Sequence, residues 1–468
     1  MKSTSALKLN SPDAVWQADR RHILHPWTQF GPFEKDGSLI FERGEGCWLW
    51  DSEGRKYFDA VGGMWCTNIG LGRAEMAQAI GEQAQKLAFS NTFVDASNVP
   101  SAQLAAKLAS LAPGDLNRVH FTTCGSTAVD TAFRMVHFYQ RALGRQEKTQ
   151  IIARDMSYHG STYIGQSLGR RPGDRVPEFL YKESGIHHLT PPNPYRAPEG
   201  MDEAAFTDFL IDEFEAKLAE LGPEKVGGFI AEPIQASGGV IVPPKDYLRR
   251  IHAICREHDI LFIADEVVTA FGRLGHWFAI EDEFGVVPDI ITCAKGLTSG
   301  YLPLGAVLFS DRIWDVMASD GERWFTSGFT YSGHPVSCAA ALKNIEIMER
   351  ENLLAQAAEV GDYFLEKLKS LESLPLIGQV RGRRLMVCVE SVASKATKEP
   401  LPEAANEAKR IADAAEAMGL MVRPMGHLNV MSPPLVMTKN DADFVVDTLR
   451  KAIVQVTDEL RREGWFRG

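Results

Sequence analysis

A single lysine, Lys295, directly follows a short apolar segment of the chain. Residues 290–293 (Ile-Ile-Thr-Cys) are mostly apolar and β-favouring, which predicts a buried strand that ends just before the lysine. Apolar surroundings disfavour the charged ammonium, so we expect a lowered pKa and a neutral amine that can attack a carbonyl carbon. This is the environment of a Schiff-base lysine. A lysine that extends from a strand end to water would give the same pattern.

Gly125 and Ser126 follow another predicted strand, at residues 119–121, and lead into a predicted helix from Thr127. The glycine permits a tight turn, and the serine adds a hydroxyl to the free N–H groups of the helix start. Together these groups form an anion site suited to a phosphate. An ordinary helix cap, without any ligand, would use the same residue types and is the alternative. The spacing of the glycines matches neither a P-loop nor a dinucleotide-binding fingerprint.

Three further strand ends carry an aromatic ring or a carboxylate. Tyr158 comes after the predicted strand 150–153, Glu232 after 226–231 and Asp265 after 260–264. The tyrosine ring could stack on a planar ligand. A carboxylate at the end of an all-apolar strand requires a cation or a hydrogen-bond donor, and a protonated heteroaromatic nitrogen would satisfy Asp265. An ion pair with Arg273 is the alternative, and His159 beside the tyrosine is equally typical of a structural histidine.

The predicted elements place these strand ends at one edge of a sheet. From about residue 71 the chain alternates helical segments with short β-rich ones; the helices are expected at 75–88, 101–111, 127–143 and 245–258, and two more strands at 290–293 and 306–309. The pattern predicts an α/β fold with a mostly parallel sheet, which binds ligands at the carboxyl ends of its strands. A phosphate cradle, a stacking ring, a carboxylate and a low-pKa lysine at this edge describe a site for pyridoxal 5′-phosphate.

The remaining segments predict a smaller α+β domain. Helices are expected at 335–350, 355–370, 403–418 and 440–463, with strands near 385–389 and 420–431. Two short strands are expected within 46–61, and 16–33 is expected to be an aromatic-rich arm. We therefore predict an N-terminal arm with part of the small domain (1–70), a large cofactor-binding domain (71–335) and a C-terminal small domain (336–468).

Composition excludes several classes of partner. The 468 residues have a formal net charge of −11, a sequence pI near 5.6 and no long block of basic residues, so nucleic acid is not an expected partner. No apolar run is long enough to cross a bilayer and no leader is recognised, so we expect a cytoplasmic protein without a membrane partner. The seven cysteines are scattered and never form a Cys-x-x-Cys pair, which predicts reduced thiols and no metal site.

Several ordered motifs resemble one known family. The segments "YHGST", "AEPIQASGGV", "ADEVVTAFGRLG", "AKGLTSGYLPLGAV" and "FTYSGHPV" are similar to those of class III, fold-type I pyridoxal-phosphate aminotransferases. Within that family the chain most resembles the ω-transaminases, the amine:pyruvate group, from about residue 20 to the C-terminus. The resemblance implies a transaminase that moves an amino group from a primary amine or ω-amino acid to a keto acid such as pyruvate.

The resemblance also implies roles for individual residues. Lys295 would form the Schiff base with the cofactor, and Asp265 would hold the pyridinium nitrogen. The other implied cofactor-binding residues are Gly125 and Ser126 at the phosphate, Tyr158 and Val267 on either face of the ring, Glu232 in a matched motif, and Thr330, which would reach the phosphate of the neighbouring subunit. That last contact implies a homodimer or a dimer of dimers.

Four positions match residues that line the substrate pocket of ω-transaminases. Arg423, in "MVRPMGHLNVMSPPL", matches the mobile arginine of this group, whose planar fork suits a carboxylate and whose long stem can swing away. A structural arginine in a salt bridge with Glu232 or a surface acid is the alternative. Trp65, Trp27 and Phe93 match pocket positions whose bulk favours slim or flat donors. A tryptophan that packs in the core is the alternative for Trp65. Two alternatives stay open. The chain could be another enzyme of the same fold, such as a racemase, aminomutase or decarboxylase, or it could be a non-catalytic cofactor-binding protein.

The chain departs from the family pattern at two places. It has Cys124 and Thr127 where many members have serine and glutamate, which puts the hydrogen bonds of the helix start in question. It has Val268 where glutamine is common, which changes the polarity expected at the cofactor's edge. Lys295 and Asp265 are unaffected.

Overall fold

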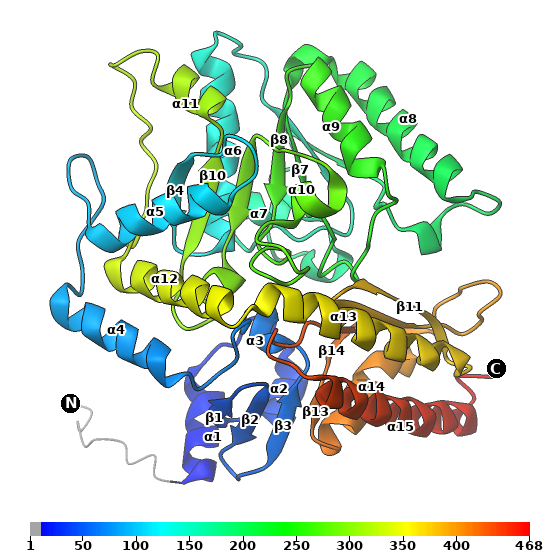
Figure 1. The fold of residues 1–468 in the computed structure, drawn as a ribbon. Coiled ribbons are helices and arrows are strands. Elements are labelled where there is room, and N and C mark those ends of the chain that lie inside the picture. The colour runs from blue at the N-terminus through cyan, green and yellow to red at the C-terminus, as the bar shows by residue number, and fades with distance from the viewer. Residues whose placement is uncertain (1–10) are drawn as a thin grey trace.

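A seven-stranded sheet forms the centre of the structure, a computed structural model that describes residues 11–468 (Figure 1). Its order is β4-β10-β9-β8-β7-β5-β6. The strands are β4 (Arg118–Thr122), β5 (Gln150–Arg154), β6 (Ile186–Leu189), β7 (Val226–Ala231), β8 (Leu261–Asp265), β9 (Ile290–Cys293) and β10 (Gly305–Phe309). Only β10 runs antiparallel to its neighbours, so the expected α/β fold with a mostly parallel sheet is confirmed.

Helices cover both faces of this sheet because its strands are apolar on both sides. Ile230 and Ile263 are buried with helix α6 (Gly125–Ala142) on one face. Phe229 and Phe262, their neighbours in sequence, are buried on the other face with α8 (Glu203–Leu221) and α9 (Tyr247–Glu257). Alternate residues of a strand point to opposite faces, so continuous apolar runs are the pattern a doubly covered sheet requires.

The other helices around the sheet are shorter or lie at its edge. They are α5 (Val99–Leu111), α7 (Tyr163–Leu168), α10 (Ala279–Phe284) and α11 (Asp311–Met317). Short 3₁₀ turns occur at Pro172–Asp174, Pro194–Arg196, Pro223–Lys225, Lys295–Leu297, Ser370–Ser373 and Glu403–Ala405.

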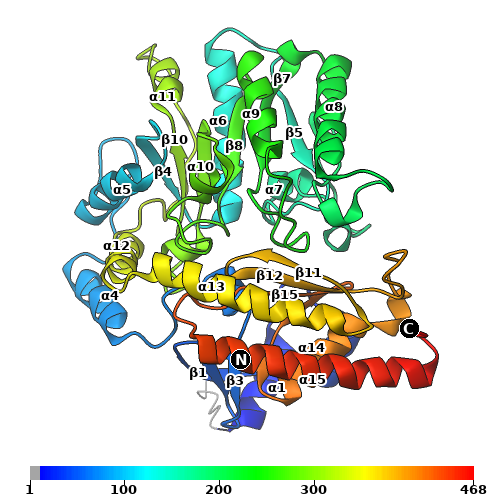
Figure 2. The same cartoon turned by 45° about the vertical axis from the view of Figure 1, so that its right-hand side comes forward.

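Two four-stranded sheets lie below the large sheet in Figures 1 and 2. The first, β1-β2-β3-β13, joins strands from both ends of the chain: β1 (Phe41–Glu45), β2 (Trp48–Asp51), β3 (Lys56–Asp59) and β13 (Leu420–Met421). The second, β11-β12-β15-β14, consists of β11 (Ile377–Arg383), β12 (Met386–Ser391), β15 (Leu428–Met431) and β14 (Arg423–Met425). The helices of this part are α1 (Pro12–His22), α2 (Phe30–Asp36), α3 (Gly62–Trp65), α4 (Ala74–Lys86), α12 (Pro335–Arg350), α13 (Leu353–Lys369), α14 (Glu407–Ala417) and α15 (Lys439–Glu463).

Some predicted elements differ from the observed ones. The two strands expected within 46–61 are present as β2 and β3, but the expected strand at 420–431 is interrupted at residue 422 and by a turn at 426–427, which gives three short strands. Helix α8 was not predicted, and the aromatic-rich arm contains α1 and α2. The division of the chain at residues 70 and 335 stays a prediction.

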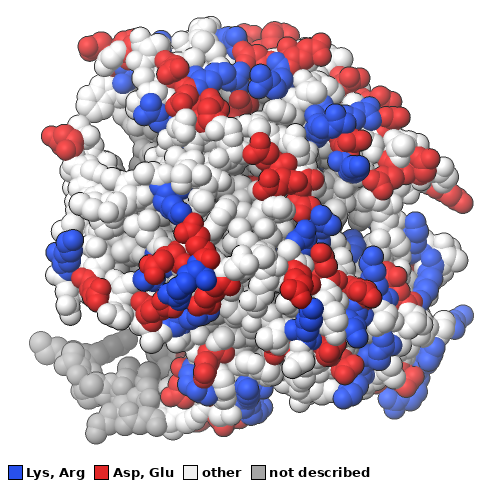
Figure 3. All heavy atoms as spheres, viewed as in Figure 1, with Lys and Arg blue, Asp and Glu red and all other residues white. Residues whose placement is uncertain are grey.

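Acidic and basic side chains are interspersed on the face shown in Figure 3, and the described residues of this face form no single large basic region. Among the helices of residues 11–468, none combines the length and the apolar character that a membrane span requires.

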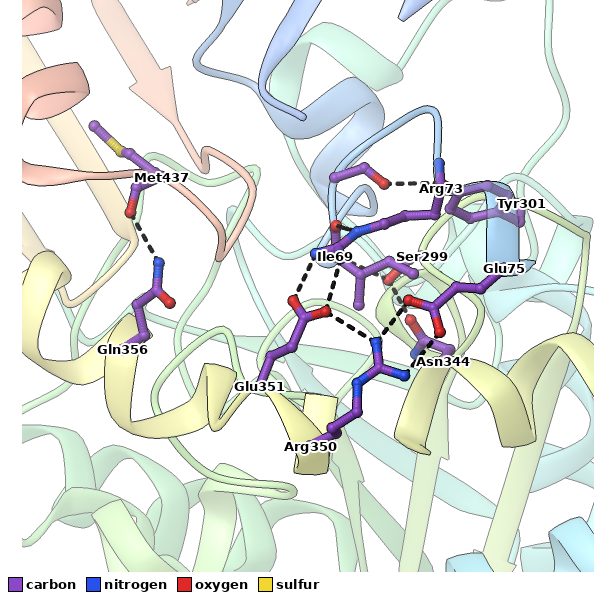
Figure 4. A network of polar contacts seen from close by, with 11 residues as sticks. Ile69, Arg73, Glu75, Ser299, Tyr301, Asn344, Arg350, Glu351, Gln356 and Met437 are labelled. Carbon is purple, nitrogen blue, oxygen red and sulfur yellow. Dashed lines mark hydrogen bonds and ion pairs between the residues drawn. The ribbon is translucent and has the colours of Figure 1, made fainter. Parts of the chain in front are cut away.

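An ion-pair network fastens the segment before α4 to the junction of α12 and α13 (Figure 4). The Arg73 guanidinium donates to both carboxylate oxygens of Glu351, at 2.8 and 2.7 Å, and its Nε donates to the Ile69 carbonyl at 2.9 Å. Arg350 donates to both oxygens of Glu75 and, at 3.0 Å, to Glu351. The neighbouring Arg73 holds the pKa of Glu351 below its usual value. The segment between α3 and α4 is thereby anchored to the end of α12.

Replacement of Arg73 by alanine should destabilise the protein by about 1–2 kcal/mol, because a half-buried bidentate ion pair and a backbone hydrogen bond are lost together. Urea unfolding of the holoenzyme measures this loss. Lys409→Ala, which breaks the exposed pair between Lys409 and Asp413 within α14, is the control and should cost no more than about 0.5 kcal/mol. Equal losses in the two variants would contradict the anchoring role.

Candidate active site

A cavity of about 440 Å³ opens at the carboxyl ends of the parallel strands. Its walls include residues at or just after the ends of five different strands, namely Ser126, Tyr158, Glu232, Asp265 and Lys295. The predicted meeting of these side chains at one edge of the sheet is what the structure shows. The edge is suited to a ligand because helix starts and strand ends present unpaired backbone groups there.

Lys295 lies in a tight turn at the end of β9. Its backbone has a φ of +42°, a left-handed conformation that is uncommon for a lysine, and it opens the 3₁₀ turn Lys295–Leu297. Burial lowers the pKa of the Lys295 amine, while the carboxylates of Asp265 and Glu232 act in the opposite direction. Within residues 11–468 the amine has no hydrogen-bond or ion-pair partner, and it lines the cavity.

Asp265, the last residue of β8, is buried among donors. Its Oδ2 lies 2.6 Å from Nδ1 of His159, and its Oδ1 accepts from the Thr292 hydroxyl at 3.1 Å and from the Val267 N–H at 3.2 Å. The expected alternative, an ion pair with Arg273, does not form: that guanidinium donates to the Asn68 side chain and to the Pro433 carbonyl. The carboxylate therefore stays available to the cavity that it lines.

His159 is a site residue that sequence reasoning left open. Its side chain is fully buried, its Nδ1 contacts Asp265, and its Nε2 has no partner among the described residues. The two residues are 106 positions apart in the chain, so no local signal in the sequence pairs them. The contact holds the Asp265 carboxylate in one orientation.

Glu232 holds the backbone around the tyrosine. One oxygen accepts from the Tyr158 N–H at 3.0 Å and the other from the Ala236 N–H at 2.9 Å. Burial raises the pKa of this carboxyl, opposed by His159 and assisted by nearby Asp265. Because both oxygens are occupied by backbone donors, Glu232 positions Tyr158 in addition to lining the cavity.

The first turn of α6 forms a narrow cradle with the loop after β5. The helix begins at Gly125, two residues earlier than predicted, so Gly125 and Ser126 have N–H groups without an intrahelical acceptor. The Ser126 hydroxyl accepts from the Ser161 N–H at 3.0 Å. Gly160 approaches so closely that a Cβ there would lie 2.6 Å from this hydroxyl oxygen. Backbone donors at a helix start and a gap that only glycine permits fit a phosphate group.

The departure at Cys124 and Thr127 leaves the helix start capped. The Thr127 hydroxyl oxygen accepts from the N–H groups of Cys124 and Thr123, at 3.1 and 3.2 Å, and donates to the Cys124 carbonyl at 2.9 Å. A threonine thus satisfies these donors at the position where the resemblance led us to expect a glutamate. Val268, the second departure, lines the cavity as an apolar side chain.

Tyr158 and Val267 lie on the cavity wall. The tyrosine ring is 6.1 Å from the Trp27 ring, and the Arg171 guanidinium lies 5.6 Å from its centroid. Burial raises the pKa of the Tyr158 hydroxyl, which bonds to Ser161 at 2.9 Å. Val267 lies against the helix start, 3.0 Å from the position of a Cβ on Gly125, and both Val267 and Tyr158 line the cavity. The residues present fit pyridoxal phosphate.

The expected substrate residues are placed in different ways. Arg423 lies on β14 with its guanidinium against the Met64 sulfur; burial and then neighbouring Arg171 lower its pKa. Trp27 is 54% exposed and donates from Nε1 to Asp174 at 2.9 Å, beside Tyr158. Trp65 is only 3% exposed and packs in a core cluster, whereas its neighbour Met64 lines the cavity.

Phe93 and Thr330 lie apart from the cavity of their own chain. Both are exposed, and they belong to adjacent loops: the Phe93 ring lies 3.5 Å from the position of a Cβ on Gly328, and the Thr92 hydroxyl donates to the Ser332 carbonyl at 3.0 Å. One chain by itself does not bring these two side chains to the site.

Comparison with known proteins agrees with the site. Residues 33–453 match the family model described as "Aminotransferase class-III". The putrescine–pyruvate aminotransferase of Pseudomonas aeruginosa is 39% identical over 462 residues, which cover 95% of this chain and 97% of that protein. The gamma-aminobutyrate transaminase 1, mitochondrial, of Oryza sativa subsp. indica is 37% identical, with 93% of this chain and 85% of that protein covered.

Solved structures give the same result. An (S)-enantioselective omega-transaminase from Thermomicrobium roseum has a TM-score of 0.93 and 40% identity, covering 95% of this chain and 99% of that one. An omega transaminase from Pseudomonas jessenii in complex with PMP has a TM-score of 0.93 and 36% identity, and the match covers 96% of this chain and 99% of that one. The chain belongs to the class-III aminotransferases, and it is a transaminase that uses pyridoxal phosphate.

Gly160→Ala should raise the dissociation constant of pyridoxal phosphate at least about 10-fold, because the added Cβ would displace Ser126 and the φ of +121° is strained for alanine. Equilibrium titration of the apoenzyme with cofactor measures the change. Gly81→Ala is the control, since nothing lies within 4 Å of its added Cβ. Unchanged affinity in the Gly160 variant would contradict the cradle.

Proposed function

We propose that this transaminase moves the amino group of a primary amine or an ω-amino acid onto pyruvate. One observation carries the proposal: the unpaired amine of Lys295 lines the cavity, and Arg423, a guanidinium for which residues 11–468 offer no acidic partner, lies beside the cavity wall. The names of the relatives, which include a putrescine–pyruvate aminotransferase and omega-transaminases, support the same pair of substrates.

Lys295 is proposed as the proton-transfer group. When bound, pyridoxal phosphate accepts the amino group and draws electrons away from the substrate Cα. The lowered pKa of Lys295 favours a neutral Nζ, which can remove the Cα proton of the donor and, in the second half of the reaction, deliver a proton to Cα of the new amino acid. The Asp265 carboxylate, oriented by His159, favours a protonated ring nitrogen.

Arg423 is proposed as the anchor of the keto-acid carboxylate. Pyruvate has a carboxylate and a simple amine donor has none, so the same pocket must bind an anion in one half-reaction and do without it in the other. Among residues 11–468 this guanidinium contacts a methionine sulfur and has no acidic ion-pair partner, so on its long stem it can turn toward the carboxylate or away from it. The kinetics should be ping-pong.

We further propose that the active unit is a homodimer or a dimer of dimers, with Thr330 completing the phosphate site of the partner. The loops that carry Phe93 and Thr330 are exposed and rich in apolar side chains: Phe89, Phe93, Val94, Trp324 and Tyr331 are between 46% and 84% exposed. Such a surface is typical of a protein interface. The predicted location in the cytoplasm stays a prediction, because the plant relatives include mitochondrial and chloroplastic proteins.

Lys295→Ala should abolish transamination while the protein folds and still binds the cofactor, because no other amine of the cavity wall can move the Cα proton. Alanine formation from pyruvate and the long-wavelength absorbance of the bound cofactor are the measurements. Retention of both alanine formation and this absorbance would refute the assignment.

Asp265→Asn should keep cofactor binding and lose most of the transamination rate, since an amide favours the protonated ring nitrogen less.

Arg423→Ala should impair the half-reaction with pyruvate by about 30- to 1,000-fold, equivalent to about 2–4 kcal/mol, because a bidentate charge-assisted contact is lost. The half-reaction with an amine that lacks a carboxylate should change little. Single-turnover absorbance separates the two. Arg423→Lys should recover only part of the loss, because an ammonium cannot present the planar fork.

A matched control for Arg423 is Arg170→Ala, which removes an exposed arginine paired with Asp155. It should leave both half-reactions unchanged. If Arg423→Ala reduces both half-reactions equally, or neither, then the arginine is structural and another group binds the carboxylate.

Thr330→Ala should weaken cofactor binding by about 1.5–3 kcal/mol if the hydroxyl bonds to the partner's phosphate group. Sedimentation of the holoenzyme together with cofactor titration tests this. A fully active monomer would sink the proposal of a shared site.

A further inference from the structure

An ion pair between Arg171 and Asp174 lies beside the cavity. Nε and Nη2 of Arg171 donate to the two oxygens of Asp174, at 3.0 and 2.5 Å, and both side chains are nearly buried. Nη1 of Arg171 contacts the Ser237 carbonyl at 3.3 Å and the Met425 sulfur at 3.4 Å. Ser237 lines the cavity, so the ion pair is at the edge of the substrate space.

Arg171 and Arg423 are neighbours on this edge. Met425, which Arg171 contacts, lies two residues after Arg423 on β14, and residues at this spacing point to the same face of a strand. The Arg171 guanidinium also lies 5.6 Å from the Tyr158 ring centroid. Its effect on the pKa of Arg423 agrees with this proximity.

The charges on this edge are two guanidinium groups and one carboxylate. Each of the three arginines in the segment 170–175 is paired with one acid: Arg170 with Asp155, Arg171 with Asp174 and Arg175 with Glu183. Arg423 has no such acid among residues 11–468. Asp174 therefore decides whether the substrate space faces one free guanidinium or two.

We propose that Asp174 restricts the acceptor to keto acids with a single carboxylate by neutralising Arg171. The inference rests on the proposed function. A keto acid with one carboxylate needs only Arg423. A dicarboxylic keto acid such as 2-oxoglutarate brings a second carboxylate, for which Arg171 is not available because it is paired with Asp174. The negative charge of Asp174 also repels this second carboxylate. Like-charge contact in a partly buried site is unfavourable, and a guanidinium held bidentately offers no free fork.

Asp174 also accepts from Nε1 of Trp27 at 2.9 Å, which makes asparagine the informative substitution. An asparagine oxygen can still accept this hydrogen bond, while the negative charge is lost and Arg171 becomes free. Asparagine also has nearly the same volume as aspartate. The contact between the N-terminal arm and the site is therefore kept, and only the charge changes.

Asp174→Asn should raise kcat/KM for 2-oxoglutarate relative to that for pyruvate by about 10- to 100-fold, chiefly through KM. The double variant Asp174→Asn/Arg171→Gln should return the ratio to its wild-type value, because the second guanidinium is gone. Steady-state kinetics with one fixed amine donor and each keto acid give the ratios. An unchanged ratio in the single variant, or a double variant that retains the gain, would overturn the proposal.

Asp155→Asn is the matched control. It makes the same chemical change at the partner of the adjacent arginine, Arg170, and that pair is 3.5 Å apart and exposed. The acceptor ratio should not change. A gain equal to that of Asp174→Asn would show a general charge effect and overturn the proposal.

Arg171→Gln keeps the test decisive if Asp174→Asn does not fold. This variant leaves Asp174 as an unpaired carboxylate, so it should lower the use of 2-oxoglutarate relative to pyruvate and raise the preference for a diamine over a monoamine donor. No shift in either preference would overturn the proposal. Wild-type activity with pyruvate tests the proposed function separately, since its absence would leave no acceptor preference for Asp174 to set.

Discussion

Charged side chains at the ends of buried apolar strands need hydrogen-bond or ionic partners, and this requirement determines how the side chains of the site are arranged. Asp265 ends a strand that is buried along its length, and an unpaired carboxylate there would be costly. His159, the Thr292 hydroxyl and the Val267 N–H meet this cost and fix the orientation of the carboxylate. Lys295 next to it has no hydrogen-bond or ion-pair partner in the part of the chain that the structure describes, which keeps its amine free. The two groups are held by different strands, so the sheet sets the distance between them.

Glycine and backbone donors complete the cofactor site. The cradle at Gly125, Ser126 and Gly160 depends on close approach of two backbone segments, and the Thr127 hydroxyl caps the helix start where the family pattern differs. The substitution is accommodated because a hydroxyl oxygen can accept the same N–H bonds as a carboxylate. The departures from the family pattern therefore leave the anion site in place.

The substrate side is assembled from distant parts of the chain. Trp27 comes from the N-terminal arm, Arg171 and Asp174 from the loop after α7, and Arg423 from β14. Asp174 joins the first two directly, and Arg171 reaches the strand that carries Arg423 through Met425.

Local pattern determined six strands of the large sheet, the aspartate and lysine at the ends of two of them, and the helix start after β4, because apolar runs and turn residues are read from neighbouring positions. It also predicted β2 and β3, but it did not predict β6. Helix α8, the His159–Asp265 contact, the burial of Trp65 and the pairing of Arg171 with Asp174 beside Arg423 were decided only by the tertiary structure. These features depend on packing between residues far apart in the chain, or on which of several acids lies nearest to an arginine, and no local spacing specifies either.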